Sequence, residues 1–202
     1  MSGCLFIVAA PSGAGKTTLV RALLSRDAHV RLSVSYTTRA AREGEVNGVH
    51  YNFTTSEDFL ARRDRGEFLE WALVHGNYYA SSRTWLEAEL AAGNDVLLEI
   101  DCQGAAQVRD IFPDAVSIFI LPPSFDVLGK RLHGRGTDSE EVIAQRLIAA
   151  EDEMRQVDHF DYVIINNDLQ VALDELTTVV RAARLRTAQV RARNPLSFLP
   201  AV

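Results

Sequence analysis

Residues 4–18 read CLFIVAAPSGAGKTT, an unbroken apolar run followed by a loop rich in glycine. The apolar run at residues 4–9 predicts a strand buried on both faces of a sheet. Residues 10–17 match the phosphate-loop pattern G-x-x-x-x-G-K-[ST], with Ala10 at the place of the first glycine. Such a loop joins a strand to the N-terminus of a helix, so we expect a helix over residues 16–26.

The residue types of this loop suit a bound triphosphate. Gly13 and Gly15 let backbone amides turn toward phosphate oxygens, and the helix N-terminus adds a partial positive charge. Lys16 can reach the β- and γ-phosphates, which makes it a catalytic candidate, and the hydroxyl of Thr17 is placed for a magnesium ion. The alternative, a glycine turn with an exposed lysine, does not explain the strand–loop–helix order. The predicted nucleotide-binding residues are Ala10, Pro11, Ser12, Gly13, Ala14, Gly15, Lys16, Thr17 and Thr18.

Beyond the loop, apolar runs alternate with helical patterns. Further buried strands are predicted at residues 95–100, 115–121 and 161–165. Helices are predicted at residues 103–111, 125–132, 140–157 and 169–188. This alternation indicates an α/β fold, a parallel sheet wrapped by helices, which binds ligands at the carboxyl ends of its strands.

Two stretches interrupt the alternation. Residues 35–79 are polar, glycine-punctuated and rich in tyrosine, which indicates an inserted unit of short strands and a helix. Residues 131–141, RLHGRGTDSEE, are charged and contain glycine, which indicates a mobile flap. We therefore expect a phosphate-loop core of residues 1–34, 94–124 and 148–202, an acceptor-binding region of residues 35–93 and a lid of residues 125–147.

Composition narrows the class of protein. The chain has 202 residues, of which 47% are hydrophobic and 24% charged, as in an ordinary globular domain. Its net charge of −6 argues against binding nucleic acid. No apolar run approaches the roughly 18 residues of a membrane span, and no signal peptide is evident. The 2 cysteines are too few for a disulfide framework, and the 5 histidines lack zinc-site spacing. We expect a cytoplasmic protein without membrane partners.

The segment after residue 176 has no acidic residue and carries arginines at positions 181, 184, 186, 191 and 193. A solvated terminal helix is the favoured interpretation. The alternatives are a contact with nucleic acid and a contact between copies of a homo-oligomer. Deleting the residues after Thr187 is expected to leave catalysis intact.

Residues 35–53 read SYTTRAAREGEVNGVHYNF and resemble the signature of the guanylate kinase family, from Thr37-Thr38-Arg39 through Phe53. Thr54 departs from the residue types usual at the next position. Similar segments continue in EWA at 70–72, GNYY at 76–79, EIDCQG at 99–104 and PP at 122–123, so the resemblance covers residues 5–186. Bacterial members also often carry alanine at the first loop position. The resemblance implies a magnesium-dependent transfer of the γ-phosphate of ATP to GMP, and also to dGMP.

The resemblance implies that Arg39, Arg42, Tyr51 and Tyr79 hold the phosphate of GMP, with Arg42 also catalytic. Guanidinium forks pair with phosphate oxygens, and phenols donate further hydrogen bonds. No general base is required, because the second pKa of a phosphate monoester is about 6 and the attacking oxygen is already ionised.

Glu70 and Ser35 are the residues expected to recognise guanine. A carboxylate accepts from the N1–H and the exocyclic amine of guanine, and a hydroxyl donates to O6. Adenine has no N1–H, so it would leave the buried carboxylate unpaired. Ser81 is expected to add a contact near the base.

Glu99 and Asp101 are two residues apart at the end of a predicted strand, so both point to one face. Asp101 is the favoured magnesium residue together with Thr17, with Asp101 expected to act through water, and both acids are candidate GMP contacts. Glu99 stands where many members of the family have aspartate.

The resemblance assigns the lid arginines and a donor-base contact. Arg135 and Arg146 would close over the phosphates, stabilise the charge of the moving group and exclude water, so both are catalytic candidates. Arg131 and Arg135 are also expected to contact ATP, and Asn166 is expected to contact adenine.

Two other functions fit the same scaffold. A kinase of a ribose bisphosphate would have no use for Glu70 and Ser35. A non-catalytic guanylate-kinase-like module that binds phosphorylated peptides would not need Lys16, Thr17 and the lid arginines.

Overall fold

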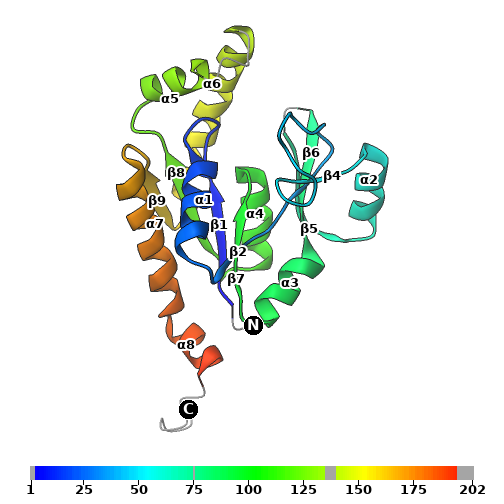
Figure 1. Ribbon diagram of the computed structural model, residues 1–202, viewed down its shortest axis with the longest axis vertical. Coiled ribbons are helices and arrows are strands. Elements are labelled where there is room, and N and C mark those ends of the chain that lie inside the picture. The colour runs from blue at the N-terminus through cyan, green and yellow to red at the C-terminus, as the bar shows by residue number, and fades with distance from the viewer. Residues whose placement is uncertain (1–2, 75, 135–139, 195–202) are drawn as a thin grey trace.

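The computed structural model describes residues 3–74, 76–134 and 140–194 (Figure 1). Its centre is a five-stranded sheet in the order β2-β7-β1-β8-β9, in which every neighbouring pair is parallel. The strands are β1 Leu5–Ala9, β2 Val30–Leu32, β7 Asp95–Glu99, β8 Val116–Leu121 and β9 Tyr162–Ile165. All of β1 is buried, as its continuous apolar sequence requires. The predicted parallel sheet is therefore confirmed.

Helices cover both faces of this sheet (Figure 1). Alternate residues of β1 point to opposite faces: Phe6 and Val8 pack with α1 and α7, and Leu5 and Ile7 pack with α3 and α4. The helices are α1 Lys16–Arg26, α2 Ser56–Asp64, α3 Arg83–Ala91, α4 Cys102–Ile111, α5 Phe125–His133, α6 Glu140–Met154, α7 Leu169–Arg184 and α8 Thr187–Arg193. In the described part of the chain, none of them is long and apolar enough to cross a membrane.

A second sheet of four strands stands beside the core, in the order β4-β3-β6-β5. Its strands are β3 Tyr36–Thr37, β4 Asn52–Phe53, β5 Phe68–Val74 and β6 Asn77–Ser82. Its own small core centres on Phe59 of α2, whose ring lies 4.7 Å from Phe68 and 5.2 Å from Tyr78. The helix that follows, α3, packs against both β5 and the core strand β7. Helix α3 thereby fixes the second sheet to the core, and the second sheet extends to the carboxyl ends of the core strands.

Three expectations about helices differ from the structure. The helix expected over residues 169–188 is broken, because Arg186 is extended (φ −56°, ψ 135°) between α7 and α8. The helix expected over 140–157 ends at Met154 and is followed by the 3-10 turn Val157–His159. The flap expected from residue 131 begins later, since α5 continues through His133. Residues 135–139 of that flap lie outside the described residues.

The C-terminal segment was expected to be a solvated helix, but two of its arginines, Arg184 on α7 and Arg193 on α8, bind a buried carboxylate, which corrects that expectation. Asp95, at the start of β7, is only 2% exposed. Arg184 donates from Nε to Asp95 at 2.6 Å and from Nη1 to Asp27 at 2.7 Å. Arg193 also donates to Asp95, and the backbone amide of Cys4 does so at 2.8 Å. These five residues are called the amino-end network below. Arg181, Arg186 and Arg191 are exposed, as expected.

Candidate active site

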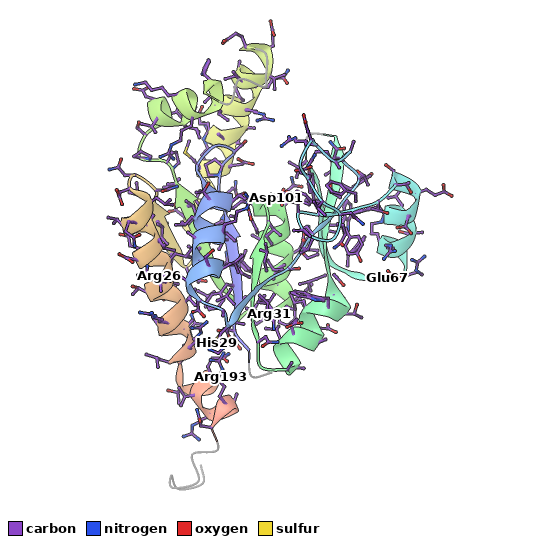
Figure 2. All side chains as sticks on the ribbon, viewed as in Figure 1. Arg26, His29, Arg31, Glu67, Asp101 and Arg193 are labelled. Atoms are coloured by element: carbon purple, nitrogen blue, oxygen red, sulfur yellow. The ribbon has the colours of Figure 1, made fainter. Side chains whose placement is uncertain are left out.

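A cavity of about 310 Å³ opens at the carboxyl ends of β1 and β7, between the core and the second sheet. It is lined by Ala10, Pro11, Ser12, Gly13, Gly15, Lys16, Thr17, Thr18, Ser35, Tyr51, Glu70, Tyr79, Glu99 and Asp101, all of which the sequence singled out. It is also lined by Ala72, Val74, Ile100 and Glu153, which the sequence analysis did not assign. Figure 2 shows Asp101 at the end of the core that faces the second sheet.

The loop between β1 and α1 has the backbone of an anion cradle. Gly13 and Gly15 have φ of 94° and 92°, a left-handed region that other residues seldom adopt. The N-cap residue of α1 is Gly15, which has no side chain to accept the first amides of the helix. Negative charge is favoured at such a position.

Lys16 and Thr17 contact the end of β7. Lys16 donates from Nζ to the carbonyl of Ile100 at 2.9 Å. The hydroxyl of Thr17 donates to the carboxylate of Glu99. Asp101 instead caps α4, where its Oδ1 accepts the amide of Gly104 at 2.9 Å. The structure thus brings Glu99, rather than the favoured Asp101, into direct contact with Thr17.

Glu70 is an acidic side chain in a nearly closed setting. It is 3% exposed and lies on β5 opposite Ser81 of β6. Burial raises the pKa of Glu70 to about 7, the charge of Asp101 adds to the effect, and Ser81 opposes it. Within the described residues Glu70 has no ion pair, and hydrogen bonding from the side chain and backbone of Ser81 is what favours its charged form. Glu70 lines the cavity, whereas Ser81 does not, so the carboxylate of Glu70 is the buried group that can accept further hydrogen bonds from a ligand.

The residues predicted for the acceptor phosphate are placed unequally. Arg39 donates from Nη2 to both carboxylate oxygens of Glu45, at 2.8 and 2.9 Å, and its guanidinium carbon lies 5.4 Å from the centre of the Tyr51 ring. The rings of Tyr51 and Tyr79 are 5.9 Å apart. Arg42 is exposed. Neither Arg39 nor Arg42 lines the cavity, whereas both tyrosines do.

Arg131 and Asn166 hold the phosphate loop from outside. Asn166 is 6% exposed and donates from Nδ2 to the carbonyl of Ala14 at 2.8 Å. Arg131 donates to the same carbonyl at 3.3 Å and to the carbonyl of Asn166 at 3.0 Å. The side-chain nitrogen of Asn166, a residue expected to contact adenine, is therefore engaged by the loop.

Of the two remaining arginines expected in the lid, the structure describes Arg146. Arg146 lies on α6, half-buried, and does not line the cavity. Arg135 lies outside the described residues.

Among the described cavity residues that the sequence analysis did not assign, Glu153 is the one with an ionisable side chain. Burial raises its pKa, while the backbone of Ser12 and the charge of Lys16 oppose the change. Its spacing from Arg146 could have revealed it, because residues seven apart lie on nearly the same face of a helix. Helix α6 thus carries an acid and an arginine along one side.

Comparisons with known proteins agree on one family. The family model described as guanylate kinase matches residues 2–183. The guanylate kinase of Aromatoleum aromaticum is 63% identical over 194 residues, which cover 96% of this chain and 95% of that protein. That of Dechloromonas aromatica is 59% identical over 198 residues, 98% of each chain. The crystal structure of guanylate kinase from Anaplasma phagocytophilum superposes with a TM-score of 0.78 at 33% identity, covering 96% of both chains.

Proposed function

The chain belongs to the guanylate kinase family, and from that premise we propose that its cavity transfers the γ-phosphate of ATP to GMP, giving ADP and GDP. One observation carries the assignment of the site: a single cavity joins the phosphate loop to the buried carboxylate of Glu70. A phosphate cradle and an acceptor for guanine N–H groups are thereby held within one enclosure. We propose dGMP as a further acceptor, because no residue of this assignment depends on the ribose hydroxyl.

The loop supplies the donor half of the site. Its amides and the N-terminus of α1 would hold the β- and γ-phosphates of ATP, and Lys16 would exchange the carbonyl of Ile100 for phosphate oxygens. Arg131 and Asn166 would act on ATP by fixing the loop at Ala14, and the side-chain oxygen of Asn166 is the atom left for adenine.

The acids at the end of β7 fit a magnesium ion. Thr17 and Glu99 already place a hydroxyl and a carboxylate together, and Asp101 lies just beyond. Magnesium prefers oxygen ligands and keeps several waters and phosphate oxygens, so one or two protein groups suffice. Thr17 and Glu99 would hold the ion, with Asp101 reaching it through water. When bound, the ion neutralises charge that develops on the transferred phosphate.

The second sheet supplies the acceptor half. Glu70, with Ser35 and Ser81 beside it, would recognise guanine, and Tyr51, Tyr79 and Arg39 would hold the phosphate. Arg39 is kept in place by Glu45, so binding a phosphate costs little ordering of its side chain. Arg42 is exposed and would reach the phosphate only when the region of residues 35–93 closes on the core.

We assign residues 125–147 as the lid over the donor phosphates. Arg146 on α6, and Arg135 by its place in the family signature, would stabilise the charge of the moving group as the lid excludes water. We propose ATP and GMP as the partners and the cytoplasm as the location, which suits the free thiols of Cys4 and Cys102.

A coupled assay of ADP release tests the function. ATP and magnesium are supplied with GMP, dGMP, AMP, CMP, UMP or ribose bisphosphate in parallel. Turnover with GMP and dGMP alone is expected. Consumption of the sugar phosphate without GMP activity would replace the proposal with another kinase of the same scaffold. Silence on every acceptor, with ATP or a phosphopeptide still bound, would replace it with a binding module.

A further inference from the structure

Gly104 lies against the carboxylate of Glu70. It is a buried residue in the first turn of α4, and a Cβ built on it would lie 2.5 Å from Oε2 and 3.1 Å from Cδ of Glu70. Carbon and oxygen atoms that are not bonded do not approach so closely. Any side chain at this position would therefore require Glu70 to move.

The backbones on either side of this contact are fixed to each other. Gln107, one turn further along α4, donates to the carbonyl of Trp71 at 2.8 Å and accepts the amide of Trp71 at 3.2 Å. Trp71 directly follows Glu70 on β5. The start of α4 is held as well, since Asp101 caps the amide of Gly104 itself. The carboxylate is the part free to give way, because it is the far end of a flexible side chain.

Resting on the proposed function, we propose that Gly104 is a specificity-determining residue, which sets the position of the Glu70 carboxylate by having no side chain. The residue touches no substrate and acts through Glu70, so it is a positioning residue. Recognition of the guanine N–H groups needs the carboxylate within about 0.5 Å of its productive place. A methyl group at position 104 would displace it by more than that.

The fold and the specificity should respond differently to Gly104→Ala. Alanine has the higher helix propensity, so α4 itself tolerates the change. The displaced carboxylate would no longer be aligned with the N–H groups of GMP, whereas the phosphate loop would bind ATP as before. The expected signature is a KM for GMP raised about 10- to 100-fold, the order expected of a misplaced contact. The KM for ATP and the melting temperature should stay near those of the unchanged protein.

The experiment measures kcat and KM for GMP and AMP at saturating ATP, the KM for ATP, and thermal unfolding, in the full-length protein and in Gly104→Ala. Ala106→Gly is the matched control, because it alters helix propensity at an exposed position of the same helix. Its preference for GMP over AMP should remain. An unaltered preference in Gly104→Ala, or an equal loss in Ala106→Gly, would overturn the inference.

Glu70→Ala removes the colliding side chain and separates the remaining outcomes. In that background Gly104→Ala should cause no further loss with GMP, so the two substitutions should be strongly non-additive. If Gly104→Ala alone unfolds the protein, the double variant should restore the fold. Additive losses, or unfolding of both variants, would contradict a role through Glu70. Absence of GMP turnover in the unchanged protein would instead refute the proposed function, and this inference with it.

Discussion

The two ends of the central sheet each hold a buried carboxylate, and the two are treated in opposite ways. Asp95, 2% exposed at the amino end of β7, is bound by Arg184, Arg193 and the amide of Cys4. Glu70, 3% exposed beside the carboxyl ends, has no ion pair among the residues that the structure describes. Figure 2 shows the two ends, with Arg193 near one and Asp101 near the other.

The difference indicates that the carboxylate at the amino end stabilises the fold, whereas the one at the carboxyl end is able to bind a ligand. A buried charge is costly unless it is paired and hydrogen-bonded. At the amino end the protein supplies the partners itself, so the carboxylate locks strand, helix and terminus together. At the carboxyl end Glu70 has no ion pair among the described residues and is hydrogen-bonded by Ser81, and burial raises the pKa of Glu70 to about 7. Under the proposed function, the N–H groups of a guanine base would be the further partners of this carboxylate.

Asp95→Ala is expected to give the largest effect, and on stability alone. It removes a carboxylate that is 2% exposed and leaves Arg184, whose side chain is 19% exposed, with Asp27 as its remaining ion-pair partner among the described residues, which should lower the free energy of unfolding by about 3–5 kcal/mol. Activity per folded molecule should persist. Urea unfolding and initial rates measure the two quantities. Asp174→Ala is the control, because its pair with Arg26 is 55% and 41% exposed and should contribute less than about 1 kcal/mol. If both variants lost the same free energy of unfolding, the amino-end network would contribute no more to stability than an exposed ion pair.

Lys16→Met should give the converse result. Removing the cation that we propose for the transferred phosphate is expected to lower kcat about 10²- to 10³-fold, by analogy with the loss of one preorganised donor. The free energy of unfolding should barely change, since the hydrogen bond of Lys16 within the described part of the chain is a single one, to the carbonyl of Ile100. If Lys16→Met kept its kcat, or lost stability instead, stability and catalysis would not be assigned to opposite ends of the sheet.

Glu70→Gln should make the protein more stable above neutral pH. The folded carboxyl has a pKa of about 7 against 4.5 for its ordinary value, so the folded state binds the proton more tightly. The stability of the unchanged protein should therefore fall as pH rises from about 4.5 to 7, by at most ~3 kcal/mol at 1.36 kcal/mol per pKa unit. Glutamine removes this dependence. Unfolding curves at pH 5 and 8 for both proteins test this dependence. Parallel pH profiles of stability would argue that burial does not raise the pKa of Glu70.

The same substitution should weaken selection of GMP. Loss of a guanine hydrogen bond worth about 1–3 kcal/mol corresponds to a change of roughly 5- to 150-fold in the preference for GMP over AMP. ATP binding should change less. The ratio of kcat/KM for the two acceptors measures the effect, and an unchanged ratio would exclude Glu70 from base recognition.

Deleting the residues after Thr187 should have the smallest effect. The deletion removes Arg193, whose side chain is 28% exposed and which shares Asp95 with Arg184. Stability should fall by about 1 kcal/mol while kcat is retained. Loss of activity in the folded, truncated protein would show that the terminal helix acts on the site.

Sequence reasoning succeeded where the signal is local. The phosphate loop and the strands that are continuous apolar runs were predicted, because their patterns lie within a few residues of one another. The edge strand Val30–Leu32 was missed, since only its first residue is buried. The contacts of Asp95 with Arg184 and of Thr17 with Glu99 join residues 89 and 82 positions apart. Nothing in either segment alone marks its partner.

The position of β1 at the middle of the sheet has a consequence for synthesis. Cys4, just before β1, is hydrogen-bonded to Asp95, 91 positions later, and β1 pairs only with β7 and β8. At about 5–20 residues per second, a ribosome needs several seconds to deliver those neighbours. The β5–β6 hairpin is complete before then, from strands adjacent in the chain. The continuous apolar strand β1 is therefore synthesised long before the strands with which it pairs. The nascent chain must keep β1 from aggregating until β7 emerges.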